Sequence, residues 1–219
     1  MLGGVLPRFR RWPIAAVLLL ACQFSVAQES ESAWPVERYA DHDYVSFAAL
    51  PEVAERLDFD RIDYPLLQAA VFYATNRQRV ANSRQPFTHS EALEGAAGEH
   101  SQAMTARRFF SHHSPVPGRR TMQARLALVG VRDTYTGENI AQSFAVEYVA
   151  GTRIRSDAVL PHHTYLGAAR AVVDQWMGSP GHRANILRSR FTHLGVGASF
   201  LPGSFPTFNM TQNFAALAE

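Results

Sequence analysis

The sequence predicts an α+β fold with an antiparallel sheet. About four segments show the helical periodicity of apolar residues, and two segments near the C-terminus, 194–200 and 208–214, alternate as strands with one buried face do. The helices and strands do not alternate as β-α-β units, and an antiparallel sheet is therefore favoured over a parallel one. A chain of 219 residues, 47% of them hydrophobic, can bury a sizeable core in one domain with extensions.

Apolar spacing and helix-start signals define the predicted helices. The first spans 65–82 on an amphipathic pattern that begins at a proline. The second follows the run Thr88–Glu91, which we interpret as a capping box, and carries His100 among alanines, where a packed histidine is expected rather than a ligand. A short third helix at 121–129 ends at a glycine, and a fourth has an apolar stripe that finishes on Trp176.

A sharp corner follows the fourth helix. Gly178 stops that helix, and Ser179–Pro180 is a helix-start signal, because a capping hydroxyl precedes a proline whose missing N–H costs nothing in the first turn. His182 is therefore expected in the first turn of a new short helix. The strand that comes next contains Gly195 and Gly197, which predict a close approach of another backbone or of a ligand.

The first 27 residues have the pattern of a secretory signal peptide. Arginines precede an apolar run at 12–21, and Ser25–Ala27 offers small residues at a cleavage point. The run Leu19–Cys22 also resembles the lipobox of bacterial lipoproteins, in which Cys22 would be lipidated and become the mature N-terminus. We therefore expect a secreted or periplasmic protein, with a lipid anchor in the outer membrane as the alternative. Cys22 is the only cysteine, so no intramolecular disulfide is available.

The rest of the chain divides into an N-terminal extension at 28–64 and a domain at 65–219. The extension lacks sustained periodicity and is interpreted as lying on the domain surface. Within the domain, the stretch 143–167 gives no clear element and is interpreted as a surface excursion. Its pair His162–His163 could supply extra metal ligands, but no carboxylate lies nearby in the sequence pattern. We therefore expect neither histidine to take part in the site.

The charge of the mature chain argues against nucleic-acid binding. All 21 basic residues are arginine, and removal of the three in the signal region leaves 18, against 19 Asp and Glu. Nucleic-acid binding needs a basic surface, and the sequence has neither a basic stripe nor a glycine-rich phosphate loop. Membrane association is expected only through a lipid at Cys22, and we expect a monomer.

Several motifs follow one another between residues 65 and 215. They are Asn76-x-x-Arg79 (or, for the arginine, its neighbour Arg77), His100-Ser101-x-x-Met104, Phe110-Ser111-His112, Gly137-Glu138-Asn139-Ile140-Ala141, Trp176-x-x-Ser179-Pro180-Gly181-His182-Arg183-x-Asn185-Ile186-Leu187, Phe191-x-x-x-Gly195-Val196-Gly197 and Thr211-Gln212-x-Phe214. In this order they resemble the bacterial branch of the CAP superfamily, also called SCP-like, which includes cysteine-rich secretory proteins, antigen 5 and plant pathogenesis-related proteins. The resemblance implies an α-β-α sandwich, with a small antiparallel sheet between helical layers, and an exported protein.

The resemblance also implies a shallow cleft lined by two histidines and two acidic residues. By position in the motifs, His112 and His182 would be the histidines and Glu138 the first acid. In animal and plant members the second acid lies three residues after the tryptophan, where this chain has Ser179. Two imidazoles and a carboxylate are a ligand set for zinc or another divalent metal, so His112, Glu138 and His182 are the candidate metal ligands.

Other interpretations of these residues stay open. Glu138 could orient a histidine for acid/base chemistry without a metal, or it could hold loops by binding backbone N–H groups. His113 could replace His112 as the inward residue, although a solvated loop side chain is expected. Ser101 and Ser111 are weak candidates for a nucleophile, because neither lies in a nucleophile elbow.

We therefore predict an exported CAP-domain protein of the cell envelope that acts as a binding module, with a cleft able to hold a divalent metal. The ligands that the resemblance implies are lipids or sterols, cell-wall fragments and partner proteins. The alternative is a hydrolase that acts on peptide, ester or glycan bonds by metal-bound water. In that case His112, Glu138 and His182 would be the catalytic residues.

Overall fold

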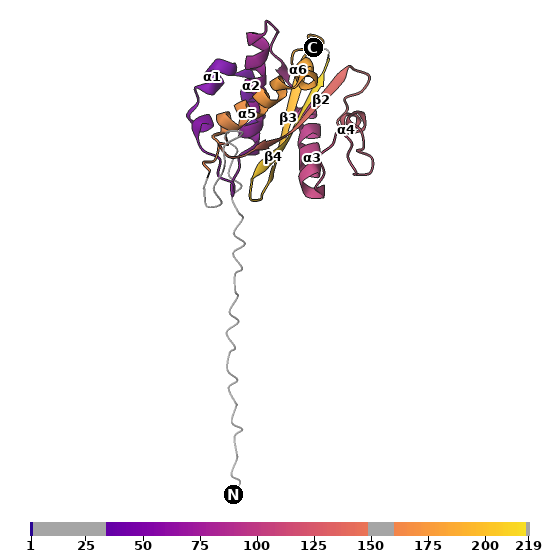
Figure 1. Ribbon diagram of the computed structural model, residues 1–219. Coiled ribbons are helices and arrows are strands. Elements are labelled where there is room, and N and C mark those ends of the chain that lie inside the picture. The colour runs from indigo at the N-terminus through magenta and orange to yellow at the C-terminus, as the bar shows by residue number, and fades with distance from the viewer. Residues whose placement is uncertain (2–33, 149–159, 218–219) are drawn as a thin grey trace. The chain divides into compact units, whose positions relative to one another are not determined.

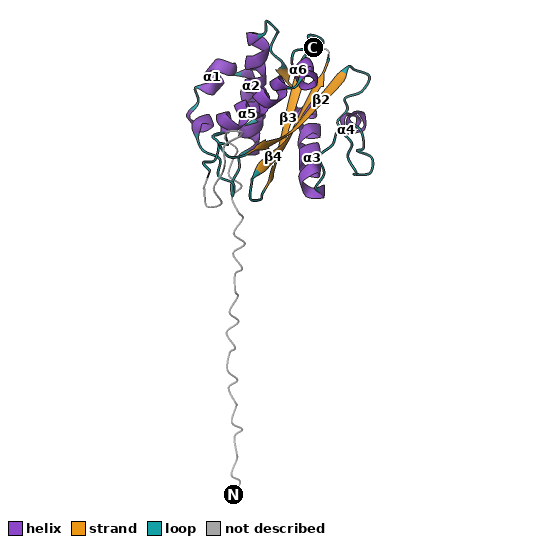
Figure 2. Cartoon of the chain, in the orientation of Figure 1, coloured by secondary structure: helices purple, strands orange, loops and turns teal. Residues whose placement is uncertain are grey.

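The computed structural model describes residues 34–148 and 160–217, together with Met1. The predicted signal peptide with Cys22 and the middle of the predicted surface excursion lie outside the described residues. Within the described ranges the elements follow in the order η1 (Val36–Ala40), α1 (Tyr44–Ala48), η2 (Pro51–Ala54), α2 (Tyr64–Ala81), β1 (Thr88–His89), α3 (Glu91–Arg107), α4 (Met122–Leu128), β2 (Thr136–Phe144), α5 (Tyr165–Gly178), α6 (Pro180–Ile186), β3 (His193–Leu201) and β4 (Thr207–Ala215) (Figures 1 and 2).

A four-stranded sheet lies between two helical layers, as Figure 1 shows. Helix α3 packs against β3 and β4 on one face, whereas α2 and α5 pack against each other and against the other face. The strand order is β1-β3-β4-β2, with β4 antiparallel to both of its neighbours and β1 parallel to β3. The α-β-α sandwich that the resemblance implies is confirmed, with the short parallel strand β1 added to its antiparallel sheet.

Helix α3 begins later than the predicted capping box. Ser90 is its N-cap and accepts a hydrogen bond from the backbone N–H of Leu93, whereas Thr88 and His89 form β1. The backbone N–H of Thr88 donates to the carbonyl oxygen of Thr192 at 2.9 Å. Interpreting Thr88 as the capping residue was wrong, because this pairing joins residues far apart in the sequence and leaves no signal in the local spacing.

Helix α3 lies close against β3 because the strand has glycines where the two backbones meet. A Cβ atom placed on Gly195 would lie 2.0 Å from the backbone nitrogen of Glu94. A Cβ atom on Gly197 would lie 2.2 Å from the backbone carbonyl carbon of Ala97. The close backbone approach predicted from these two glycines is therefore confirmed, and the partner is α3.

Strand β2 lies at one side of the sheet, and helix side chains bond to its backbone. The donors and their carbonyl acceptors are Trp176 and Ile140 (3.2 Å), Gln175 and Gln142 (3.3 Å), and Asn185 and Glu138 (3.3 Å). The three acceptors are two residues apart, so their carbonyl groups point to the same side of the strand. These bonds fix α5 and α6 against the strand that carries Glu138.

Arg79 connects α2 to the predicted corner. Its buried guanidinium donates from Nη1 to the carbonyl oxygens of Ile186, at 2.7 Å, and Arg188, at 3.1 Å. Its Nε donates to the carbonyl oxygen of Gln85 at 2.6 Å. Carbonyl groups at the end of a short helix have no partner within that helix, and Arg79 supplies one. The end of α6 is thereby held in place, and with it the helix that carries His182.

The described part of the 28–64 extension is packed into the main core. Trp34, Phe47 and Val53 are buried together with residues of α2. The Trp34 ring lies 4.9 Å from the ring of Phe47 and 5.7 Å from that of Tyr73. Elements η1, α1 and η2 have five, five and four residues, which is too short for a periodic pattern to show burial. The extension thus contributes large core side chains, which its sequence does not indicate.

The two described ends of the 143–167 stretch pair with each other. Val146 and His162 form an isolated antiparallel bridge, and the backbone N–H of His163 donates to the carbonyl oxygen of Ala145 at 3.0 Å. The His162 ring stacks on Phe59 with centroids 3.8 Å apart. This histidine therefore contacts the N-terminal segment. Among the described residues, no helix combines the length and the apolar character needed to cross a membrane.

Candidate functional site

The carboxylate of Glu138 is buried on β2 and bonded at both oxygens. Oε1 accepts a hydrogen bond from Nδ1 of His112 at 2.8 Å, and Oε2 accepts one from Nη2 of Arg125 at 2.5 Å. The side chains of Glu138 and Arg125 are 3% and 2% exposed, whereas that of His112 is 48% exposed. A buried ion pair therefore lies behind a histidine that reaches the surface.

Glu138 is ionised at neutral pH. Burial raises the pKa of its carboxyl group, but the hydrogen bond from His112 and the charge of Arg125 lower that pKa by more, so the net pKa lies below the ordinary value. An ionised carboxylate can only accept hydrogen bonds. Nδ1 of His112 therefore carries the shared proton, and in the neutral imidazole the lone pair is left on Nε2.

The loop that carries His112 is fastened from two sides. Nε2 of the buried His100, on α3, bonds to the carbonyl oxygen of Ser111 at 3.1 Å. Nη1 of Arg125, on α4, donates to the carbonyl oxygens of His112 and Arg119, both at 3.2 Å. The guanidinium of Arg125 thus binds both the Glu138 carboxylate and the backbone of His112, and that carboxylate orients the His112 ring. His100 is a packed histidine, as the sequence predicts.

His182 lies in the first turn of α6, where the helix-start signal places it. Ser179 is the N-cap and Pro180 begins the helix, but the predicted capping by the Ser179 hydroxyl is wrong, because its side chain makes no capping hydrogen bond. Nδ2 of Asn139 donates to its carbonyl oxygen at 3.2 Å, and Nδ2 of Asn185 donates to Oδ1 of Asn139 at 2.9 Å. Partial burial, followed by the charge of nearby His112, lowers the pKa of His182. The two histidines are therefore close enough to interact electrostatically, and His182 is neutral at neutral pH.

The structure brings His112 and Glu138 into direct contact and places His182 within electrostatic reach of His112. Among the described residues, no group of three or more His, Cys, Asp or Glu side chains is arranged to hold a metal ion. The neighbour His113 is exposed on the loop, as expected. The assignment of all three residues as metal ligands stays a prediction.

Arg125 is the site residue that the sequence analysis missed. In the sequence of its helix, Met122, Leu126 and Val129 fall on one face, and Arg125 occupies the remaining position of an i, i+3, i+4, i+7 pattern that begins at Met122. An arginine on an apolar stripe implies a buried carboxylate partner, because an unpaired charge is costly to bury. That position could have indicated the partner of Glu138.

The buried state of His100 predicts a pH-dependent stability. Burial, the largest cause, lowers its pKa from the ordinary 6.5 to about 4. Below pH 6.5 the unfolded chain therefore takes up a proton that the folded chain does not, and stability that is complete above pH 6.5 is lost as the pH falls toward 4. Between pH 7.5 and 5 we expect His100 to lower the free energy of unfolding by about 2 kcal/mol.

Urea denaturation of the wild type and of His100→Asn at both pH values checks this expectation. The variant lacks the titrating group. From pH 7.5 to pH 5, its free energy of unfolding should therefore fall by about 2 kcal/mol less than that of the wild type. His113→Asn is the matched control, since His113 is exposed, and it should behave as the wild type does. Equal pH dependence in the wild type and His100→Asn would contradict the prediction.

These observations define the class of protein as an α-β-α sandwich in which a strand carboxylate orients a loop histidine beside a second histidine on a short helix. The chain belongs to the cysteine-rich secretory protein (CAP) family, whose model matches residues 72–214. The match includes His112, Glu138 and His182.

Individual relatives agree with this assignment. The uncharacterized protein YkwD of Bacillus subtilis is 28% identical over 177 residues, which are 78% of this chain and 59% of that protein. The uncharacterized membrane protein YlbC of the same organism is 32% identical over 123 residues, which are 56% of this chain and 29% of that protein. The chain thus spans less than two thirds of either relative. A crystal structure of an extracellular Bacillus anthracis protein that contains an SCP domain superposes with a TM-score of 0.54 at 25% identity, covering 74% of this chain and 45% of that one.

Proposed function

We propose that the protein is an exported binding module of the cell envelope, whose cleft binds a divalent transition metal through His112 and His182. The observation that carries this proposal is the hydrogen bond between Nδ1 of His112 and the buried carboxylate of Glu138. A carboxylate that accepts from one ring nitrogen of a histidine orients the other nitrogen and raises its basicity, as in many metal sites of proteins.

The chemistry of the donor set fits such a metal. His112 offers Nε2 at a half-exposed position, and the lowered pKa of His182 keeps its imidazole neutral. Neutral imidazoles suit zinc, copper and nickel. Glu138, by contrast, has both oxygens bonded and is nearly inaccessible, which favours the orienting role over direct ligation. A bound metal would supply a positive centre that attracts an anionic oxygen of a lipid, a cell-wall fragment or a protein ligand.

The binding role is favoured over covalent catalysis by the surroundings of the two serines. Ser101 Oγ is buried, donates to the carbonyl oxygen of Gly197 and lies 2.9 Å from Oγ1 of Thr211. Ser111 Oγ accepts from the backbone N–H of His113. Among the described residues, neither hydroxyl is bonded to the imidazole of a histidine, as an activated nucleophile would be. Hydrolysis by metal-bound water remains the alternative function of the same cleft.

A zinc titration of the purified mature protein by calorimetry tests the proposal. We expect one zinc ion per chain, with binding abolished in His112→Ala and in His182→Ala. Glu138→Gln should weaken binding by about 10- to 100-fold, because the histidine loses its orienting carboxylate. His113→Ala, a change at the adjacent exposed histidine, is the matched control and should bind as the wild type does.

The outcomes separate the possibilities clearly. Zinc binding that is indifferent to both histidine substitutions would overturn the proposed cleft. If zinc binds as expected, the zinc-loaded protein can be assayed for product release from peptide, ester and glycan substrates. Product release that is lost in His182→Ala would favour the hydrolase.

A further inference from the structure

Three fully buried polar side chains connect α2 to the first turn of α6. Thr75 on α2, Gln212 on β4 and Asn139 on β2 are all 0% exposed. Nε2 of Gln212 donates to Oγ1 of Thr75 at 2.8 Å, and Nδ2 of Asn139 donates to Oε1 of Gln212 at 3.1 Å. Nδ2 of Asn139 also donates to the carbonyl oxygen of His182 at 3.2 Å. The buried network of Thr75, Gln212 and Asn139 therefore ends on the backbone of a candidate metal ligand.

Each member of the buried network fixes the orientation of the next. The Thr75 hydroxyl donates to the carbonyl oxygen of Val71 at 2.7 Å, and a carbonyl oxygen only accepts. The lone pairs of the hydroxyl are therefore left for the NH2 group of Gln212, which turns the carbonyl oxygen of that amide toward Asn139. The NH2 group of Asn139 in turn faces Gln212 and α6, while its Oδ1 accepts from Nδ2 of Asn185 at 2.9 Å. One backbone carbonyl on α2 thus determines the amide orientations as far as α6.

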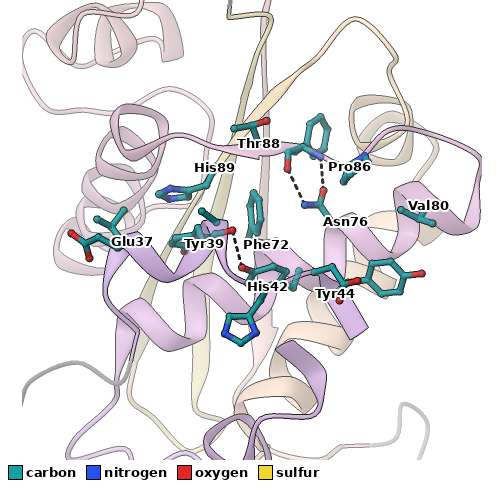
Figure 3. Close-up of a pocket in the computed structure, with 15 residues that line it drawn as sticks. Glu37, Tyr39, His42, Tyr44, Phe72, Asn76, Val80, Pro86, Thr88 and His89 are labelled. Atoms are coloured by element: carbon teal, nitrogen blue, oxygen red, sulfur yellow. Dashed lines mark hydrogen bonds between the residues drawn. The ribbon is translucent and has the colours of Figure 1, made fainter. Parts of the chain in front are cut away.

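Helix α2 is a fixed base for this network. The residue after Thr75 is Asn76, which bonds to both backbone groups of Phe87 (dashed lines in Figure 3): Nδ2 donates to the carbonyl oxygen at 3.0 Å, and Oδ1 accepts from the N–H at 2.7 Å. One turn beyond Thr75, Arg79 donates to the carbonyl oxygen of Ile186 at the end of α6. Helix α2 therefore holds α6 at both ends, directly through Arg79 and through the buried network at the first turn.

The depth of this network indicates a positioning role. Buried polar groups cost free energy unless they are bonded, and apolar side chains of similar size fill such space without that cost. A fully bonded network, in contrast, favours one arrangement of its members. The bond from Asn139 to the carbonyl oxygen of His182 therefore fixes where the first turn of α6 lies, and with it the place of the imidazole beside His112.

We propose that Thr75 and Gln212 are positioning residues for His182. They hold the backbone of its turn through Asn139, so that the imidazole lies beside that of His112. Both are fully buried, so they act through the first turn of α6 rather than on a ligand. The inference rests on the proposed function where it concerns metal affinity, but the place of the ring is measurable without a metal. Loss of the Thr75 hydroxyl should let the two amides reorient and displace the imidazole.

NMR spectra of the zinc-free mature protein at neutral pH test the place of the ring. The ring resonances of His182 are assigned by their absence in His182→Ala. Thr75→Val replaces the hydroxyl by a methyl group of similar size, and Gln212→Met removes the amide at nearly constant volume. Both variants should shift the His182 ring resonances. Thr75→Ser keeps the hydroxyl and should leave these resonances at their wild-type positions.

Thr211→Val is the matched control for Thr75→Val. Thr211 is also fully buried and precedes Gln212 on β4, but its side chain lies on the opposite face of the sheet, where Oγ1 accepts from Oγ of Ser101 on α3 at 2.9 Å. The control therefore removes a buried hydrogen bond at the same depth without touching the buried network. It should lower stability to urea about as Thr75→Val does, yet leave the His182 resonances in place.

Zinc titration of the same variants tests the effect on the site. Zinc affinity should fall by about tenfold in Thr75→Val and Gln212→Met, and it should stay unchanged in Thr75→Ser and Thr211→Val. His182 resonances that stay in place in the first two variants, or that move as far in Thr211→Val, would overturn the inference, and so would unchanged zinc affinity in the first two. If the wild type binds no zinc, the proposed function fails, and the NMR spectra alone decide on the positioning role.

Discussion

Replacing Arg125 by methionine is expected to lower the free energy of unfolding by about 3–5 kcal/mol. The change removes the buried partner of Glu138 and leaves an uncompensated carboxylate that is 3% exposed. It also removes the hydrogen bonds to the carbonyl oxygens of His112 and Arg119. Urea denaturation at pH 7 measures the loss, and zinc titration of the same variant at low temperature tests whether the His112 loop has lost its order.

The double variant Arg125→Met/Glu138→Leu separates the charge from the packing. Replacing both members of a buried ion pair by apolar residues is often close to neutral, so the double variant should regain most of the stability lost in the single one. A double variant no more stable than Arg125→Met would show that the loss comes from the loop contacts and would contradict the role assigned to the ion pair.

Replacing Gly197 by alanine should lower the free energy of unfolding by about 3 kcal/mol or more, the upper end for overpacked cores. The added Cβ would lie 2.2 Å from both the carbonyl carbon of Ala97 and the backbone nitrogen of Gly98. Backbone atoms of a helix cannot move aside as the end of a side chain can, so α3 would have to leave the sheet. Thermal and urea denaturation measure the effect.

Gly98→Ala is the matched control, since it changes a glycine on the helical side of the same contact. A Cβ there would meet nothing within 4 Å, and alanine is favoured over glycine in a helix by about 0.5–1 kcal/mol. The control should therefore be as stable as the wild type or more so. Similar losses in both variants would contradict the explanation by close backbone approach.

The local signals of the sequence were sufficient for the elements near the site. The glycine stop and the Ser179–Pro180 pair predict the corner, and His182 lies in the first turn of α6, as expected. The glycines of β3 predict a close approach, which α3 makes. Such features depend on a few neighbouring residues and on backbone conformation, and a single sequence therefore contains them.

Features that depend on distant partners could not be predicted in the same way. The parallel strand β1 exists only through its pairing with β3, and Trp34 is buried only because α2 and α1 surround it. Of the candidate site, the resemblance supplied the identity of His112, Glu138 and His182. The direct bond between the first two, and the clamp by Arg125, are three-dimensional facts that no motif contained.

The side-chain donors along β2 have a consequence for self-association. An outer strand with unpaired carbonyl groups is a template on which the strand of another molecule can add, and such addition leads to aggregates. On β2 the carbonyl groups of residues 138, 140 and 142 are already bonded by side chains from α5 and α6. An incoming strand would have to displace a buried tryptophan before it could pair, and this side of the sheet is thereby protected from edge-to-edge growth.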